Sequence, residues 1–151
     1  MRIMGIDFGT KRIGIAISDE LLLTAQGIDS LYRKELKADL DELARLAREN
    51  SVGEIIVGLP LNMNGTYSAK TKEVVEFIDA LSKVVTVPVK TWDERLSSMQ
   101  AERVLLEADA SRAKRRHVTD RLAAQIILQS YLDSRNPAPS SEGGKKEEGA
   151  G

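Results

Sequence analysis

One stretch near the N-terminus constrains the fold more than any other part of the chain. Residues 2–19 read RIMGIDFGTKRIGIAISD, which is two apolar runs separated by the polar turn Gly9-Thr10-Lys11-Arg12. In the second run isoleucines alternate with small residues, as expected of a strand with two different faces. The stretch therefore predicts a hairpin of two strands, with a helix packed closely over Gly14 and Ala16.

Asp7 is the one carboxylate inside the first apolar run. Aspartate is rare in strands, and a buried carboxylate is costly unless it is hydrogen-bonded, paired or bound to a cation. One interpretation is that Asp7 caps the turn by accepting hydrogen bonds from the amides of Gly9 and Thr10. The other is that Asp7 is a metal ligand or a general base. This stretch alone leaves both open.

Composition limits the kinds of site that the chain can build. With 151 residues it suits one domain, and with no cysteine and one histidine it excludes disulfides, thiolate metal sites and His-rich zinc sites. A catalytic metal would have to be held by oxygen atoms, which favours Mg²⁺ or Mn²⁺. No apolar run approaches the roughly 18 residues of a membrane span, and the N-terminus does not read as a signal peptide. We therefore expect a soluble cytoplasmic protein that does not bind membranes.

The C-terminal segment differs in composition from the rest of the chain. Residues 137–151 read PAPSSEGGKKEEGAG, which predicts a disordered low-complexity tail after a single domain over residues 1–136. The tail carries three Glu and two Lys, so it accounts for the whole net charge of -1. The basic residues of the neutral body are free to cluster. The densest basic stretch, 111–117 (SRAKRRH), reads as a solvated connection between helices.

Hydrophobic periodicity predicts the remaining helices and strands. Strands are expected over 24–32, 54–59 and 85–92, and helices over 36–50, over 68–83, from Ser97 onward and over 119–134. The 54–59 strand is apolar throughout, as expected of a central parallel strand, and Pro88 places the 85–92 strand at an edge. The polar loop 60–65 joins a strand end to a helix start, where α/β proteins commonly bind phosphates.

Three acids lie at ends or centres of these elements. Asp7 is in the first strand, Glu94 follows the last strand, and Asp120 opens the last helix on its buried face. Each has an ordinary explanation when taken alone, such as capping or compensation of a helix dipole. Together they are more informative, because all three have basic neighbours and a twisted sheet can bring them together. Clustered acids need cations and flanking basic residues need an anion, and a phosphodiester with bound magnesium supplies both.

Four segments of the chain, in order, resemble the YqgF/RuvX family: DFGTKRIGIAISD, GLPLNMNG, DERLSS with AERVLL, and DRLAAQIILQSYLD. Members of that family are described as Holliday junction resolvases or as nucleases of pre-16S ribosomal RNA. The resemblance implies an α/β, RNase H-like fold. This fold has a mixed five-stranded sheet, with three antiparallel strands at one side, two parallel strands added, and helices on both faces.

The resemblance also implies the residues of the site. Asp7, Glu94 and Asp120 match the catalytic acids that bind divalent metal. Our mechanistic hypothesis is that Asp7 bridges two Mg²⁺ or Mn²⁺ ions, with Glu94 and Asp120 each completing one coordination sphere. Asp93 belongs to the same DER motif, but strand alternation points it away from Glu94. The candidate contacts to nucleic acid are the basic and loop residues near these acids, namely Lys11, Arg12, Asn62, Asn64, Gly65, Arg95, Arg112, Lys114, Arg115 and Arg116.

We therefore expect a divalent-metal-dependent endonuclease that processes the 5′ end of pre-16S ribosomal RNA, as a monomer or weak homodimer. A Holliday junction resolvase acting on branched DNA is the first alternative, and it would favour a symmetric dimer. A nucleic-acid-binding factor without nuclease activity is the second. An actin-like ATPase is the third, because DFGT resembles the phosphate-binding hairpin of that superfamily. Those proteins need two such domains, for which this chain has no room.

Overall fold

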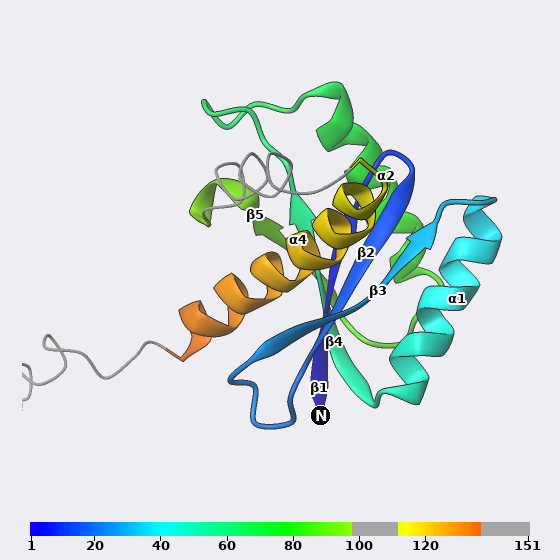
Figure 1. Ribbon diagram of the computed structural model, residues 1–151, viewed down its shortest axis with the longest axis vertical. Coiled ribbons are helices and arrows are strands. Elements are labelled where there is room, and N and C mark those ends of the chain that lie inside the picture. The colour runs from blue at the N-terminus through cyan, green and yellow to red at the C-terminus, as the bar shows by residue number, and fades with distance from the viewer. Residues whose placement is uncertain (98–111, 137–151) are drawn as a thin grey trace, which may run out of the picture.

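The computed structural model describes residues 1–97 and 112–136, and of residues 112–120 it describes the backbone alone. In this part of the chain one five-stranded sheet is flanked by helices (Figure 1). The strands are β1 (Arg2–Phe8), β2 (Arg12–Ser18), β3 (Ala25–Tyr32), β4 (Val52–Leu59) and β5 (Val89–Asp93). The helices are α1 (Leu36–Glu49), α2 (Ala69–Ser82), the short 3-10 helix η1 (Glu94–Leu96) and α4 (Arg112–Arg135).

The sheet has the strand order β3-β2-β1-β4-β5. β1 pairs antiparallel with β2, and β2 pairs antiparallel with β3. β4 lies parallel to β1 on its other side, and β5 lies parallel to β4. Three antiparallel strands followed by two parallel ones are the mixed sheet that the family resemblance implied. The predicted fold is confirmed.

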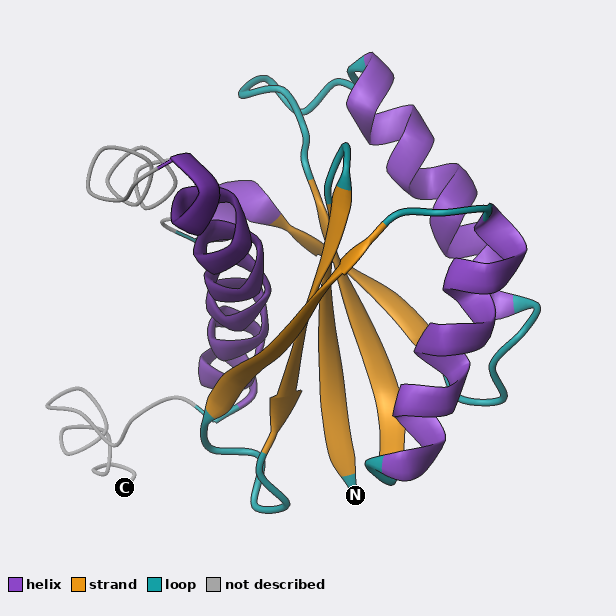
Figure 2. Ribbon diagram, turned by 45° about the vertical axis from the view of Figure 1, so that its right-hand side comes forward, coloured by secondary structure: helices purple, strands orange, loops and turns teal. Residues whose placement is uncertain are grey.

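Helices cover both faces of the sheet (Figure 2). α1 and α2 lie on one face and α4 lies on the other. The alternation in β2 determines which side chains meet which layer, because Ile13, Ile15 and Ile17 enter the core under α1 and α2. Ala16 points to the opposite face and packs in the cluster that α4 completes. The small residues of β2 therefore accommodate a helix, as the sequence indicated.

Glycines let α4 approach the sheet closely. A Cβ atom on Gly5 would lie 2.7 Å from the Cβ of Leu128, and one on Gly27 would lie 2.7 Å from the carbonyl oxygen of Arg121. Both distances are shorter than atoms in contact allow, so a larger residue in β1 or β3 would push the helix outward. The position of α4 thus depends on the absence of side chains below it.

Two glutamines of α4 seal the outer edge of β3. The amide of Ala25 donates to Oε1 of Gln129 at 2.8 Å, and the amide of Gly27 donates to Oε1 of Gln125 at 3.1 Å. Nε2 of Gln129 in turn donates to the carbonyl of Leu23 at 3.0 Å. An edge strand normally offers such groups to a strand from another chain. Here side chains of the same domain occupy them.

Two predicted boundaries are wrong by more than two residues. The last strand begins at Val89 and not at residue 85, and Pro88 precedes it; the carbonyl of Pro88 accepts the amide of Ile55 at 2.9 Å. The described part of α4 already includes Arg112, so residues 112–117 of the basic stretch are helical and not a connection. Arginine, lysine and alanine are strong helix formers, and no glycine or proline interrupts the run.

Some predictions lie outside the described residues. These are the helix expected beyond Ser97 and the disordered tail at 137–151. Among the residues that the structure does describe, no helix combines the length and the apolar character needed to cross a membrane.

Candidate active site

A pocket of about 290 Å³ opens at the end of the sheet where β1 and β4 finish. Two of the three predicted acids, Asp7 and Glu94, line it, together with the Gly9–Thr10 turn and Lys70. The exposed fractions of Asp7 and Glu94 are 4% and 9%. Two buried carboxylates that lie far apart in the sequence thus face one cavity.

Asp7 comes to the pocket from β1, where it pairs with Gly14 of β2. Its neighbours Ile6 and Phe8 belong to the core under α1 and α2, so strand alternation places Asp7 on the α4 face. The turn after Asp7 is closed by the backbone, because the Gly9 amide donates to the Arg12 carbonyl at 2.9 Å.

Glu94 reaches the pocket by folding over β4. It is the first residue of η1, directly after β5, and its Oε2 would lie 2.7 Å from a Cβ atom on Gly58. The parallel register joins Ile6 to Val57, which brings Gly58 alongside Asp7. The glycine therefore provides the space through which Glu94 approaches Asp7.

Asp120 lies in α4, and its side chain is outside the described atoms. The prediction that Asp120 opens the last helix is wrong, because residues 112–119 before it are already helical. Asp120 shares a helix face with the buried Ala123, Ala124 and Ile127, as the spacing predicted. Figures 1 and 2 place the N-terminal turns of α4 at the same end of the sheet as the C-terminal end of β1.

Asp93 and Arg95 form a pair beside the pocket. The guanidinium of Arg95 donates to both carboxylate oxygens of Asp93, with Nη2 at 2.8 Å from Oδ2. These hydrogen bonds lower the pKa of Asp93 and raise that of Arg95. Arg95 also donates to the carbonyl of Met63 at 3.1 Å, so it ties η1 to the loop before α2.

The predicted loop residues Asn62, Asn64 and Gly65 shape the loop itself. Asn62 and Asn64 both bond to the Thr66 hydroxyl, at 2.9 and 2.7 Å. Gly65 has a φ of +88°, a conformation that glycine adopts most readily, and its amide donates to the Asn62 carbonyl at 2.8 Å. None of the three is among the residues that line the pocket.

The predicted basic contacts divide into two groups. In the β1–β2 turn, the guanidinium of Arg12 lies 4.2 Å from the ring centroid of Tyr32 and donates to its hydroxyl. Lys11 follows Thr10, and its carbonyl accepts the amide of Arg33 at 2.9 Å. The second group is at the start of α4, where only the backbone is described: Arg112, Lys114, Arg115 and Arg116.

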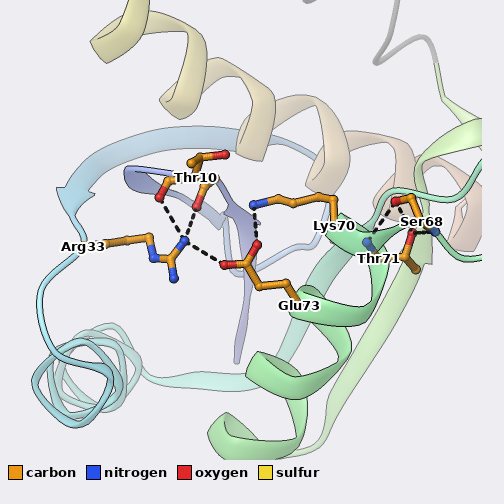
Figure 3. A network of polar contacts seen from close by, with 7 residues as sticks. Thr10, Arg33, Ser68, Lys70, Thr71 and Glu73 are labelled. Atoms are coloured by element: carbon orange, nitrogen blue, oxygen red, sulfur yellow. Dashed lines mark hydrogen bonds and ion pairs between the residues drawn. The ribbon is translucent and has the colours of Figure 1, made fainter.

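The sequence analysis missed a network of charged residues behind the turn (Figure 3). Nη1 of Arg33 donates to the carbonyls of Gly9 and Thr10, at 3.0 and 2.9 Å. It also meets Oε2 of Glu73 at 3.1 Å, and the other oxygen of Glu73 meets Nζ of Lys70 at 3.4 Å. Lys70 follows Ser68, the predicted helix start, so the strand–loop–helix pattern indicated its region but not its identity.

The described donor atoms suit a hard divalent cation. Asp7 and Glu94 offer carboxylate oxygens, the ligands that Mg²⁺ and Mn²⁺ prefer. Among the residues whose side chains are described, no group of three acids or histidines is close enough to bind a metal. Asp120, the third predicted ligand, is not among them. The pocket thus supplies part of a ligand set of the predicted chemistry.

Comparison of the sequence with known proteins assigns the chain to a family. The family model described as "RuvX: Holliday junction resolvase" matches residues 1–134. The chain belongs to the RuvX family. A RuvX-family relative in Syntrophomonas wolfei, named "Putative pre-16S rRNA nuclease", is 57% identical over 133 residues, which cover 88% of this chain and 94% of the relative. A relative of the same name in Halothermothrix orenii is 52% identical over 136 residues, covering 90% and 97%.

Solved structures share the RuvX-family fold at low sequence identity. RuvC of Thermus thermophilus, in complex with a Holliday junction substrate, aligns with a TM-score of 0.58 and 14% identity, covering 91% of this chain and 96% of that one. The fowlpox virus resolvase bound to Holliday junction DNA aligns with a TM-score of 0.55 and 16% identity, covering 90% and 99%. The fold is therefore the RuvC-like form of the RNase H fold.

Proposed function

We propose that this chain is a divalent-metal-dependent endonuclease that hydrolyses phosphodiester bonds in the processing of the 5′ end of pre-16S ribosomal RNA. The observation that carries the proposal is the pocket in which Asp7 and Glu94 are both buried. Buried carboxylates of like charge repel each other unless a cation or a proton lies between them. A site of this kind binds a cation that can in turn bind a phosphate.

Asp7, Glu94 and Asp120 are the residues that would hold Mg²⁺ or Mn²⁺. When bound, a divalent ion supplies Lewis-acid activation of the phosphodiester and lowers the pKa of water. The protein contributes position, because Asp7 is fixed within β1 and Glu94 is held between β5 and Gly58. Burial contributes as well, since the attraction between a carboxylate and a cation is stronger where water is excluded.

The choice of substrate follows the sequence relatives. The cited relatives from S. wolfei and H. orenii are named for pre-16S ribosomal RNA and are more than half identical to this chain over nearly their whole length. The family description and the RuvC-like fold favour a second candidate, a resolvase of Holliday junctions. The solved structures are only 14% and 16% identical in sequence to this chain, so they support the fold and not the substrate. RNA is therefore the first candidate.

The test compares two labelled substrates side by side, a precursor 16S leader fragment and a four-way DNA junction. Wild-type protein and Asp7→Asn are incubated with each at low salt, with Mg²⁺ or Mn²⁺, because contacts to phosphates weaken as salt rises. Asp39→Asn is the matched control, since Asp39 is also buried, at 6% exposed, but bonds to the Lys34 amide away from the pocket.

We expect cleavage of the RNA by the wild type and by Asp39→Asn, and loss of cleavage in Asp7→Asn. Cleavage of the junction alone, with the same dependence on Asp7, would replace the first proposal by the resolvase. Binding of either substrate without cleavage would favour a non-catalytic factor. Equal cleavage by wild type and Asp7→Asn would show that another nuclease contaminates the preparation.

A further inference from the structure

Lys70 is the one basic residue among the described side chains that line the acid pocket. Of the predicted phosphate contacts with described side chains, Lys11 is exposed and does not line the pocket, and the two arginines are engaged elsewhere. Arg95 is bound by Asp93 and the Met63 carbonyl, and the guanidinium of Arg12 stacks on Tyr32. The described lining of the pocket therefore has a single cation, which belongs to none of the motifs that indicated the site.

The ammonium of Lys70 is held at the pocket by two neighbours. Its Nζ lies 3.4 Å from Oε1 of Glu73 and 5.2 Å from the ring centroid of Phe8. Phe8 directly follows Asp7 in β1, and its other neighbours are the guanidinium of Arg33, at 4.2 Å, and the stacked ring of Phe77. Phe8, the residue after Asp7, thus helps to hold the Lys70 ammonium in place.

The same contacts connect Lys70 to the turn after Asp7. Glu73 binds Lys70 with one oxygen and Arg33 with the other, and Arg33 holds the carbonyls of Gly9 and Thr10 (Figure 3). Because Arg33 also pairs with Glu73 of α2, these two hydrogen bonds fix the position of the turn relative to α2. The distance between the acid strand and the Lys70 ammonium is therefore set by side chains from three separate elements.

The charge balance of this network is positive. Arg33 and Lys70 contribute +2 and Glu73 contributes -1, which leaves +1 beside the two acids. Burial acts to raise the pKa of Glu73, but the charges of Lys70 and Arg33 outweigh it and leave that pKa below its ordinary value. Glu73 thus stays ionised and positions Lys70 without removing the excess positive charge.

We propose that Lys70 binds a non-bridging oxygen of the substrate phosphodiester in the pocket, and that Glu73 and Arg33 are the residues that position it. This inference rests on the proposed nuclease function. A phosphodiester that reaches Asp7 and Glu94 occupies the pocket whose wall carries Lys70. An ammonium there offsets the negative charge of the phosphate, which gains further charge as hydrolysis proceeds.

The test uses Lys70→Ala and Lys70→Arg, with Lys72→Ala as the matched control. Lys72 lies on the same helix but is exposed and does not line the pocket. Cleavage of the leader RNA is measured with Mg²⁺, and binding is measured with Ca²⁺ over a range of salt concentrations. Loss of one phosphate contact lowers the slope of log K against log salt by about 0.7 for a single strand.

We expect Lys70→Ala to lower the single-turnover rate by about tenfold or more and to reduce the salt slope by about 0.7. Lys70→Arg should retain both, and Lys72→Ala should match the wild type. For the positioning role, Glu73→Gln should slow the wild type but add little in the Lys70→Ala background, because coupled residues are not additive. A merely structural effect of Glu73 would slow both backgrounds equally.

The outcomes separate this inference from the function on which it rests. If the wild type cleaves the RNA and Lys70→Ala behaves as Lys72→Ala does, the proposed phosphate contact of Lys70 is wrong and the proposed nuclease function is retained. If wild type binds RNA without cleaving it, and Lys70→Ala reduces the salt slope, the nuclease proposal is wrong and the phosphate contact stands. If wild type binds neither RNA nor the DNA junction, both are overturned.

Discussion

Oε2 of Glu94 lies 2.7 Å from the point that a Cβ atom on Gly58 would occupy. The same point is 2.5 Å from Cδ1 of Ile127 in α4, so a methyl group there would meet both the acid and the helix. We predict that Gly58→Ala lowers the free energy of unfolding by about 1–3 kcal/mol, as overpacking of a core does. Urea denaturation measures this loss, and the cleavage assay should show reduced activity in the folded variant.

Gly53→Ala is the control for that experiment. Gly53 is in the same strand, but an added Cβ would meet only the side chain of Met1, which is exposed and free to move aside. We expect a change of less than about 1 kcal/mol, of either sign. If the two variants were destabilised equally, the close contact at Gly58 would not be the cause.

Binding of a divalent metal should raise the melting temperature of the wild type. A ligand that binds only the folded state adds about 2.7 kcal/mol at one hundred times its dissociation constant. We predict that Mn²⁺ produces this shift in the wild type and in Asp39→Asn, but not in Asp7→Asn or Glu94→Gln. Differential scanning fluorimetry with and without Mn²⁺ measures it. An undiminished shift in both pocket variants would mean that the metal binds elsewhere.

Gln129→Ala should weaken the sealed edge of the sheet. The change leaves the Ala25 amide and the Leu23 carbonyl without the side chain that binds them. An unsatisfied group costs about 1–3 kcal/mol when it is buried, and less where water can replace the partner. We expect a loss at the lower end of that range and faster hydrogen exchange of the Ala25 amide. Gln26→Ala, at an exposed position of the same strand, should leave the exchange rate unchanged.

The stability of the protein should fall in acid partly because of Glu54. This residue joins three elements, since it accepts from Tyr131 at 2.7 Å and pairs with Lys90 at 2.9 Å. Burial acts to raise its pKa, but these hydrogen bonds outweigh burial and lower the pKa below its ordinary value of 4.5. A lowered pKa contributes stability above the ordinary value, and that stability is lost as the pH falls through the folded value.

We therefore predict that Glu54→Gln makes the free energy of unfolding less dependent on pH below about 4.5. Chemical denaturation of both proteins from pH 7 to pH 3 measures the difference. Glu76→Gln, at an exposed position of α2, is the control and should follow the wild-type curve. Parallel curves for wild type and Glu54→Gln would contradict the prediction.

Much of the fold could be predicted because the strands carry clear patterns. The alternation from Ile13 to Ile17 indicated both a strand and the helix above it, and the apolar run before Pro60 indicated a central strand. The start of β5 was missed because residues 85–87, Val-Thr-Val, have the β-branched composition of a strand, although the register with β4 begins only at Val89. Only pairing with β4 in the folded protein distinguishes the residues of β5 from the similar residues before them.

The site was predicted only in part, for a similar reason. Asp7 was conspicuous because a carboxylate is out of place in an apolar strand, and Glu94 belonged to a motif. Lys70, Glu73 and Arg33 are ordinary surface residues in the sequence, and no local pattern marks them. Their relation exists only after β3 and α2 have been brought beside the turn, so no spacing along the chain reveals it.

Among the described elements, α4 alone covers one face of the sheet. Ile3, Ala16 and Ile56 are buried against residues of that helix, which is the last element described. A chain emerging from the ribosome shows this apolar face to water until residues 112–136 have been synthesised. Folding of the domain must therefore wait for its C-terminal helix. A chain cut short before that helix would be a substrate for proteases and chaperones before it could act on any RNA.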